Sequence, residues 1–317
     1  MVGRRKSIAF EDLKRYWGEV IFAKPPKIHF GKYDLVVAQE PTLRIGPPAY
    51  LAAKLCGAKF IIEVHGGYLG RWLKGANGKV ATIMLKKADL VRVVNENIAR
   101  QLRGMKLKKV ITIPAIYIKT DVFRPIKRHS ERDNLVLYAG RFVFEKNLPL
   151  LIKAFRHVVK EEPSAKLLLI GEGPEKNLLR RLIISEGIEE NARILNRWLS
   201  HKELASYYND AAIFALTSYY EGGPRAICEA GACRTPFIST PVGILPEIIE
   251  NGVGGFFLES REPLELAEKI IIMLQDHQLR EKMGENFRRV VIEHFEWGKA
   301  VKRYAEAYLK FYRERLD

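Results

Sequence analysis

The chain has 317 residues, 47% of them hydrophobic, and a formal net charge of +16. This composition excludes an intrinsically disordered chain, and the length suits two globular domains that each have a core. No apolar run is long enough to span a bilayer, and the N-terminus MVGRRKSIAF has no apolar segment like that of a signal peptide. We therefore expect a cytoplasmic protein.

The excess positive charge lies in the first part of the chain. Residues 1–125 hold 24 Lys and Arg against 9 Asp and Glu, whereas the remainder holds 29 against 28. A field of this strength attracts polyanions such as nucleic acid, an anionic membrane or phosphate-bearing substrates. A thermophilic origin would also fit, since the chain has only four glutamines. Heat adaptation should increase the numbers of acidic and basic residues together, so it does not explain why the excess positive charge lies in the first part.

The first part of the chain alternates strands and helices. About thirty residues precede its first regular strand, enough for one helix (11–17) and one strand (19–23). Apolar runs and helical spacing then predict strands at 33–41, 59–67, 89–96 and 110–116, and helices at 47–57 and 78–88. The polar, charged segment 123–134 is the expected linker.

The second part continues the same alternation. We expect strands at 134–141, 166–174, 192–196, 213–218, 236–242 and 255–259, and helices at 148–162, 175–187, 201–211, 262–276 and 297–317. Strands that alternate with helices form parallel sheets covered by helices, and ligands bind at the carboxyl ends of such strands. The predicted fold class is therefore α/β with two Rossmann-like domains.

The stretch EGGPRAICEA contains the first candidate site. A strand ends near residue 218, and a helix should begin near Pro224, because proline suits a first helical turn. Gly222 and Gly223 leave room for a ligand, and a helix N-terminus attracts phosphate. Glu221 and Glu229 would then lie towards opposite ends of a nucleotide sugar and accept hydrogen bonds from its hydroxyl groups. The alternative is an ordinary strand-to-helix loop with a capping glutamate.

Three further loops follow strands of the predicted sheets. GRFVFEKN supplies Arg141 and Lys146, two cations suited to a leaving diphosphate. GEGP supplies Gly171 and Gly173, which allow close backbone approach, although the loop lacks the spacing of a dinucleotide fingerprint. His65 ends a strand of the first part, and we assign it to the site although a lone histidine is more often structural.

The three cysteines match neither a disulfide framework nor, with histidine, a zinc site. Cys228 and Cys233 fall within apolar stretches, so we interpret both as small core residues rather than nucleophiles. A reducing compartment and the absence of a metal site are expected.

Taken together, these motifs resemble the second domain of retaining glycosyltransferases with the GT-B fold, of the family 4 type (glycosyl transferases group 1). The resemblance covers residues 134–312 and is carried by YAGRFVFEKNLPLLIKAF, LLLIGEGPEKNLL, the Glu-x7-Glu stretch with its flanks, and NGVGGFFLE. EVHGG and ADLVRVVNENIARQL are similar to strands of that family's first domain. The implied organisation is an N-terminal acceptor-side domain (1–126), shortened relative to the family, a nucleotide-sugar domain (127–298) and a closing helix (299–317) that crosses back to the first domain.

The resemblance also implies roles for individual residues. Arg141 and Lys146 would bind the donor diphosphate, Glu229 the ribose, and Glu221 and His65 the sugar. The nucleobase would lie by Gly171 and the stretch from Arg197 to Leu199, and the backbone near sugar and phosphate would come from Gly222, Gly223, Pro224, Arg225 and Ala226. The implied reaction transfers a sugar from a UDP- or GDP-linked donor with retention of the anomeric configuration and without a metal or other cofactor.

Other interpretations concern partners. A shortened first domain would also suit a non-catalytic subunit, or one completed by a partner. A nucleic-acid binder is disfavoured because no such motif or aromatic platform is present. The segment 68–87 mixes apolar and aromatic residues with cations, which suits reversible contact with an anionic membrane at the cytoplasmic face and a lipid-linked or glycan acceptor. Its residues are Tyr68, Leu69, Arg71, Trp72, Leu73, Lys74, Lys79, Lys86 and Lys87. The alternative for this segment is that Trp72 and Leu73 are core residues and the lysines are solvated, but the one-sided charge of the first part favours the membrane.

Overall fold

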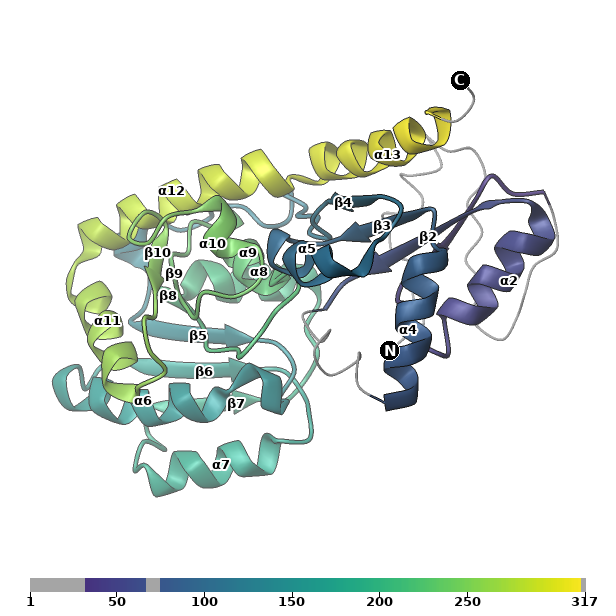
Figure 1. Ribbon diagram of the computed structural model, residues 1–317. Helices are drawn as coiled ribbons and strands as arrows, with labels where there is room; N and C mark the ends of the chain where they lie inside the picture. Colours follow the sequence, from purple (N-terminus) through teal and green to yellow (C-terminus); the bar gives the residue numbers. More distant parts are fainter. Residues whose placement is uncertain (1–31, 67–74, 315–317) are drawn as a thin grey trace. The chain divides into compact units, whose positions relative to one another are not determined.

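The computed structural model describes residues 32–66 and 75–314, which form two compact units (Figure 1). The first unit contains the described residues up to Ala115 together with those from Gly298 onward, and the second comprises Ile116–Trp297. The helix and strand expected at 11–17 and 19–23, and the part of the membrane-contact segment before residue 75, lie outside the described residues.

The first unit is built on a parallel sheet with the strand order β1-β2-β3-β4. Its strands are β1 (Leu35–Ala38), β2 (Lys59–Val64), β3 (Leu90–Val93) and β4 (Val110–Thr112). Its helices are α2 (Gly46–Cys56), α4 (Gly75–Lys87), α5 (Glu96–Leu102), the 3-10 helix η1 (Arg103–Met105) and α13 (Trp297–Arg313). The first residue of α13, Trp297, belongs to the second unit. The central strands β2 and β3 are buried almost throughout, because helices cover a parallel sheet and leave little of it to solvent. A core of apolar side chains from the strands and from α2, α4 and α5 holds the unit together.

The second unit is built on a parallel sheet with the order β10-β9-β8-β5-β6-β7. Its strands are β5 (Leu135–Ala139), β6 (Lys166–Ile170), β7 (Ala192–Leu195), β8 (Ile213–Leu216), β9 (Phe237–Ser239) and β10 (Gly255–Phe257). Its helices are η2 (His129–Glu131), η3 (Phe144–Lys146), α6 (Leu148–Glu161), α7 (Lys176–Ser185), α8 (His201–Asp210), α9 (Arg225–Ala232), α10 (Leu245–Ile248), α11 (Pro263–Gln275) and α12 (His277–Phe295). Helix α11 packs against α6, and α12 packs against α9. The predicted α/β class with two parallel sheets is confirmed.

The strand order of the second unit creates a switch point between β5 and β8. The chain adds β6 and β7 on one side of β5, then returns and adds β8, β9 and β10 on the other side. The loops that follow β5 and β8 therefore leave neighbouring strands in opposite directions, and ligands of doubly wound sheets bind at such a point. Arg141, Lys146 and Glu221 lie on these two loops.

Three α-helices were not predicted from the sequence: α5, α10 and α12. Helix α12, of 19 residues, begins after Asp276, whose carboxylate accepts the N–H of Leu279 at 2.8 Å and caps it. The helix expected near Pro224 is present as α9, which begins at Arg225 with Pro224 as its N-cap at φ −75° and ψ 84°. Among residues 32–66 and 75–314 no helix is long and apolar enough to cross a membrane.

Candidate active site

The loops that follow β5 and β8 are tied to each other at the switch point. The Thr217 hydroxyl donates to the backbone oxygen of Lys146 at 2.9 Å, and the Tyr219 N–H donates to the backbone oxygen of Glu145 at 2.9 Å. Thr217 is buried, so this connection is part of the fold rather than a surface contact. It fixes the 3-10 turn η3, which carries Lys146, against the loop that carries Glu221.

Lys146 and Glu221 form an ion pair at this position. Lys146 Nζ donates to Glu221 Oε1, and the Ser218 hydroxyl donates to the same oxygen at 2.7 Å. The side chains of Lys146 and Glu221 are 17% and 11% exposed, so the pair is largely shielded but open on one side. Both bonds go to one oxygen of the carboxylate, so lone pairs remain with which it can accept a further hydroxyl group.

Arg141 lies on the loop after β5, and its side chain is exposed. Its backbone oxygen accepts the Tyr138 hydroxyl at 3.0 Å. Within the described ranges its guanidinium makes no hydrogen bond or ion pair with another residue. The guanidinium can therefore bind an external anion without first breaking an internal contact.

Gly171 and Gly173 are required by the contact between the loops that follow β5 and β6. The backbone of Phe142 donates to the oxygen of Glu172 at 2.8 Å, and Gly140 donates to the oxygen of Ile170 at 2.9 Å. A Cβ at Gly171, where φ is +144°, would lie 1.8 Å from the oxygen of Gly140, and one at Gly173 would lie 2.2 Å from the oxygen of Phe142. The close approach predicted from these glycines occurs between two backbone segments of the chain itself.

The stretch from Gly222 to Ala226 forms the entry to α9. Gly222, Gly223 and Ala226 are half-buried, whereas Arg225 is exposed. No side chain caps this helix, whose N-cap is Pro224. The first backbone N–H groups of α9 therefore have no side-chain acceptor, which is the arrangement that attracts a phosphate group.

Glu229 is buried in α9 and both of its carboxylate oxygens are engaged. Arg225 Nε donates to Oε1 at 2.8 Å, and the Tyr208 hydroxyl donates to Oε2 at 3.2 Å. Burial raises the pKa of Glu229 above its ordinary value, against the lowering effects of Arg225 and Tyr208. An ionised carboxylate has about four acceptor positions, so about two remain beyond these bonds, enough for two neighbouring hydroxyl groups.

Arg197 and Leu199 lie between β7 and α8. Arg197 is exposed and pairs with Glu203 at 3.1 Å between Nη1 and Oε1. Leu199 is half-buried and packs on the core, and Ser200 caps α8 in a reciprocal arrangement with Glu203. The segment follows β7, which is the neighbour of β6 in the sheet, so it leaves the same sheet edge as the loop of Gly171.

His65 belongs to the first unit and directly follows β2. Its Nε2 lies 2.9 Å from Glu63 Oε2 and 3.1 Å from Gln39 Oε1. The His65 side chain is 31% exposed and that of Glu63 is 2% exposed, so a solvent-accessible histidine contacts a buried acid.

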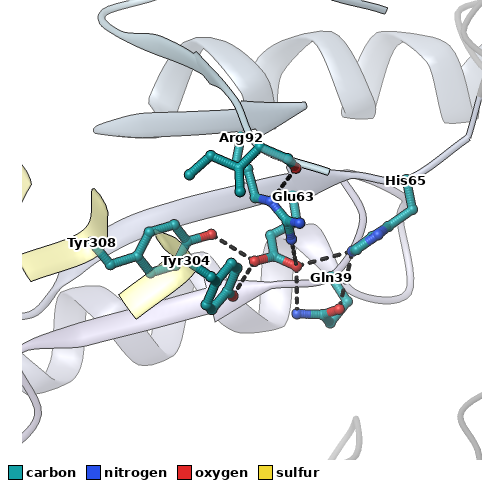
Figure 2. Close-up of polar contacts among 7 residues, drawn as sticks. Gln39, Glu63, His65, Arg92, Tyr304 and Tyr308 are labelled. Atoms are coloured by element: carbon teal, nitrogen blue, oxygen red, sulfur yellow. Dashed lines mark hydrogen bonds and ion pairs between the residues drawn. The ribbon is translucent and has the colours of Figure 1, made fainter. Parts of the chain in front are cut away.

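Glu63 belongs to a buried polar cluster that was not predicted from the sequence (Figure 2). Its Oε2 pairs with Arg92 Nη1 at 3.1 Å, and its Oε1 accepts the hydroxyls of Tyr304 and Tyr308, the latter at 2.6 Å. Burial alone would raise the pKa of Glu63, but Arg92, His65 and Tyr304 hold it below its ordinary value. The available signal was an acid within the apolar strand KFIIEV, since a buried carboxylate needs partners.

Glu40, two residues after β1, is a second acid in this region. It is half-buried, and its Oε2 has no hydrogen-bond partner among the described residues. Burial raises the pKa of Glu40 to about 8, the negative charge of Glu63 adds to this, and a hydrogen bond with the His65 backbone opposes it. The raised pKa favours the protonated form of Glu40 at neutral pH.

The two cysteines of the second unit are core residues, as predicted. Cys228 and Cys233 are both 0% exposed, and burial raises the pKa of Cys233 to about 12. Neither thiol can act as a nucleophile in this environment.

Comparison with known proteins places this chain among sugar transferases. Residues 119–290 match the model of the family described as glycosyl transferases group 1. The chain is 27% identical over 280 residues to the N-acetyl-alpha-D-glucosaminyl L-malate synthase of Bacillus anthracis, covering 84% of this chain and 72% of that protein. It is 29% identical over 187 residues to an uncharacterized glycosyltransferase of Methanocaldococcus jannaschii, covering 59% of this chain and 51% of that protein.

Solved structures share the fold at lower identity. The HepE protein of Anabaena, solved in complex with UDP, aligns with a TM-score of 0.76 and 19% identity over 88% of this chain and 79% of that one. The sucrose-phosphate synthase of Thermosynechococcus elongatus aligns with a TM-score of 0.75 and 21% identity over 89% of this chain and 74% of that one. At this level of identity, both structural similarities show only that the fold is shared.

Proposed function

Because this chain belongs to the glycosyl transferases group 1 family, we propose that it moves a sugar from a nucleoside-diphosphate donor, UDP- or GDP-linked, to an acceptor hydroxyl. The observation that carries the proposal is the pairing of Lys146 with Glu221 at the switch point of the second sheet. A cation for the diphosphate and a carboxylate for the sugar are thereby held side by side, where doubly wound sheets bind ligands.

The donor is assigned to the loops of the second unit. Arg141, whose guanidinium has no internal partner among the described residues, and Lys146 bind the diphosphate, together with the backbone N–H groups at the start of α9. Glu229 accepts the ribose hydroxyls with its remaining lone pairs. Gly171 and the segment from Arg197 to Leu199 border the base, and His65 contacts a sugar hydroxyl.

We propose transfer with retention and without a metal ion. The bond between the anomeric carbon and the diphosphate oxygen breaks, and a bond from the acceptor oxygen forms on the same face of the sugar. The acceptor proton passes to the departing phosphate, whose growing negative charge Arg141 and Lys146 stabilise. Two positioned cations can supply the counter-charge that a divalent metal supplies elsewhere.

UDP is the first donor nucleotide to test. The Anabaena neighbour was solved with UDP and with UDP-glucose, and the Bacillus anthracis relative is named for an N-acetyl-glucosaminyl product. The identity of the sugar is a separate question, which the screen of nucleotide sugars below addresses.

For the acceptor we propose a lipid-linked or glycan hydroxyl presented at an anionic membrane surface. The net charge of +15 over residues 1–125 supports this, as do exposed apolar side chains on the helices of the first unit. Leu51 and Leu55 of α2 and Ile83 of α4 are about half exposed, and Lys86 and Lys87 at the end of α4 are exposed. Apolar groups beside cations suit the headgroup region of a bilayer.

The test is a screen of UDP- and GDP-sugars against the full chain. A true donor raises the melting temperature by mass action, and its hydrolysis or transfer is then followed by product analysis with and without EDTA. We expect one nucleotide class to stabilise the chain and its sugar to be released in both conditions. Stabilisation without turnover, restored by a second protein, would instead favour a partner-dependent subunit. No stabilisation by any nucleotide sugar would contradict the proposal.

A further inference from the structure

The carboxylate of Glu63 joins four elements of the first unit. Its partners are Gln39 just after β1, His65 just after β2, Arg92 of β3 and the two tyrosines of α13, which Figure 2 shows converging on it. The side chain is 2% exposed, and an isolated buried carboxylate would be strongly unfavourable. The partners therefore hold this group in one place and in its ionised form.

The chemistry of Glu63 decides how His65 is protonated. An ionised carboxylate can only accept hydrogen bonds. The amide of Gln39 donates through Nε2 to Glu63 Oε2 at 2.9 Å, so its oxygen Oε1 is the atom that faces His65, and it too can only accept. Both neighbours of His65 Nε2 are thus acceptors, so Nε2 carries the proton. Nδ1 has no partner among residues 32–66 and 75–314, and it is the ring nitrogen that a ligand can use.

We propose that Glu63 is a positioning residue for sugar transfer, which keeps His65 in the Nε2-protonated form and leaves Nδ1 to accept a hydrogen bond from a hydroxyl group of the sugar. The inference rests on the proposed function for the role of the sugar, but the bond between Glu63 and His65 does not. A fixed ring orientation removes the freedom that an exposed histidine would otherwise lose on binding its substrate.

Helix α13 takes part in this arrangement through its two tyrosines. Tyr304 and Tyr308 are one helical turn apart, so both hydroxyls reach Glu63 Oε1, while the guanidinium of Arg92 lies 4.7 Å from the centre of the Tyr304 ring. Arg92 Nε also donates to the backbone oxygen of Ile113 at 2.9 Å. The last helix of the chain thereby holds the acid that orients His65.

The first experiment observes the His65 Nε2 proton by NMR on the full chain labelled with ¹⁵N-histidine, and it needs no substrate. We expect a downfield Nε2–H resonance that is absent in His65→Gln, retained in Tyr308→Phe, and moved upfield or lost by exchange in Glu63→Gln. Glu63→Asp keeps the charge opposite Arg92 but withdraws it from His65 by one methylene, so it should have the same effect if Glu63→Gln does not fold. A resonance that is unchanged in both Glu63 variants, or a wild-type ring protonated only at Nδ1, would overturn the inference.

The second experiment measures the contribution to turnover as a double-mutant cycle, with UDP-glucose hydrolysis as the probe. We expect Glu63→Gln and His65→Ala each to lower kcat on the order of tenfold, and the double variant to be no worse than His65→Ala alone. Lys108→Met, which breaks an exposed pair with Asp89 in the same unit, is the control and should leave kcat unchanged. Additive losses would overturn the positioning role. If the wild type does not hydrolyse UDP-glucose, this nucleotide sugar is not the donor. The Nε2–H resonance then still tests whether Glu63 fixes the protonation of His65.

Discussion

Lys146 and Glu221 are 75 residues apart in the sequence and form an ion pair between the two loops of the switch point. Glu221 accepts hydrogen bonds from both Lys146 Nζ and the Ser218 hydroxyl. The Lys146 ammonium group therefore already has an anionic partner before any ligand is bound. A diphosphate would compete for that cation. The two residues should therefore have opposite effects on nucleotide affinity.

Glu221→Gln should separate binding from turnover. The substitution removes the negative charge that holds Lys146 and leaves an amide of the same size. We expect UDP affinity to stay the same or to rise up to about tenfold, because the ammonium group becomes free to bind phosphate. Hydrolysis of the donor sugar should fall far more, since the proposed function assigns the carboxylate to the sugar. Calorimetry and product analysis on one preparation check both, and a parallel loss of affinity and rate would contradict the assignment.

Glu229 and Tyr208 form a matched pair for the ribose assignment. Glu229→Ala removes the proposed acceptor of the ribose hydroxyls, so UDP binding should weaken by roughly 1 to 3 kcal/mol. Tyr208→Phe removes the hydroxyl that donates to Glu229 Oε2 and should cost about 1 kcal/mol of folding free energy with a smaller effect on affinity. If calorimetry gives equal affinity for Glu229→Ala and wild type, Glu229 does not bind the ribose.

Gly171→Ala should disrupt the contact between the loops that follow β5 and β6. The added methyl would lie 1.8 Å from the backbone oxygen of Gly140, and the residue has φ +144°. We expect a loss of more than about 3 kcal/mol in folding free energy, because neither backbone can yield easily. Gly187→Ala is the control: its φ is +66° but its Cβ would meet nothing within 4 Å, so about 1 kcal/mol is expected. Similar melting temperatures for the two variants would show that the loops can separate.

Glu40 should make the stability of the chain depend on pH in the neutral range. Its pKa is raised to about 8, so between about 4.5 and 8 the folded state keeps a proton that the unfolded state releases, and stability falls as pH rises. Glu63 acts in the opposite sense at acidic pH: its lowered pKa contributes stability that is present above about 4.5 and lost below it. Above about pH 5 the contribution of Glu63 is already present, so a further change of stability with pH is expected from Glu40.

Glu40→Gln tests this assignment. The amide cannot ionise, so the variant should be more stable than wild type at pH 9, by at least about 1 kcal/mol, and close to it at pH 5. Thermal unfolding followed by circular dichroism at several pH values gives the comparison. Equal differences at pH 5 and pH 9 would mean that Glu40 does not retain its proton in the folded state.

The fold was largely predictable because apolar periodicity is local. Strands such as KFIIEV and KLLLI and the helix LPLLIKAFRHVVKE stand out within a few residues, and each is present. Helix α12 was missed although Leu279, Met283, Phe287 and Val291 recur every four residues after the capping Asp276, because the apolar run that ends at residue 276 masked the start of a new helix.

The candidate residues of the second unit were recognisable because they lie on loops that follow strands of one parallel sheet, and Lys146 and Glu221 pair across two such loops. Glu221, Gly222 and Glu229 share a short stretch, so their connection was visible in the sequence. The cluster around Glu63 was not, because Tyr304 and Tyr308 lie more than 240 residues away and their partner is fixed only when α13 packs on the first unit. Similarly, Gly171 could be recognised as a position of close approach, but the sequence did not say that the approaching group is the backbone of Gly140.

Contact with anionic membranes should depend on the lysines of α4. Wild-type chain should co-sediment with vesicles that contain anionic lipid, but not with neutral vesicles, and salt should release it, since each cation near the surface contributes about 1 kcal/mol. Lys79, Lys86 and Lys87 are exposed, and changing them together to Glu should abolish binding. The exposed lysines 160, 202 and 282 of the second unit provide the control triple. Equal effects of the two triples would indicate attraction by overall charge rather than by this face.

The most direct test of the account is calorimetric titration of the full chain and of its Lys146→Met variant with UDP and with GDP. We predict saturable binding of one of the two nucleotides by the wild type, weakened at least about tenfold in Lys146→Met, because the diphosphate loses a charged hydrogen-bond donor. Lys153→Met, an exposed lysine on α6, should bind as the wild type does. Failure of both nucleotides to bind, or equal affinity in wild type and Lys146→Met, would contradict a diphosphate site at the switch point between β5 and β8.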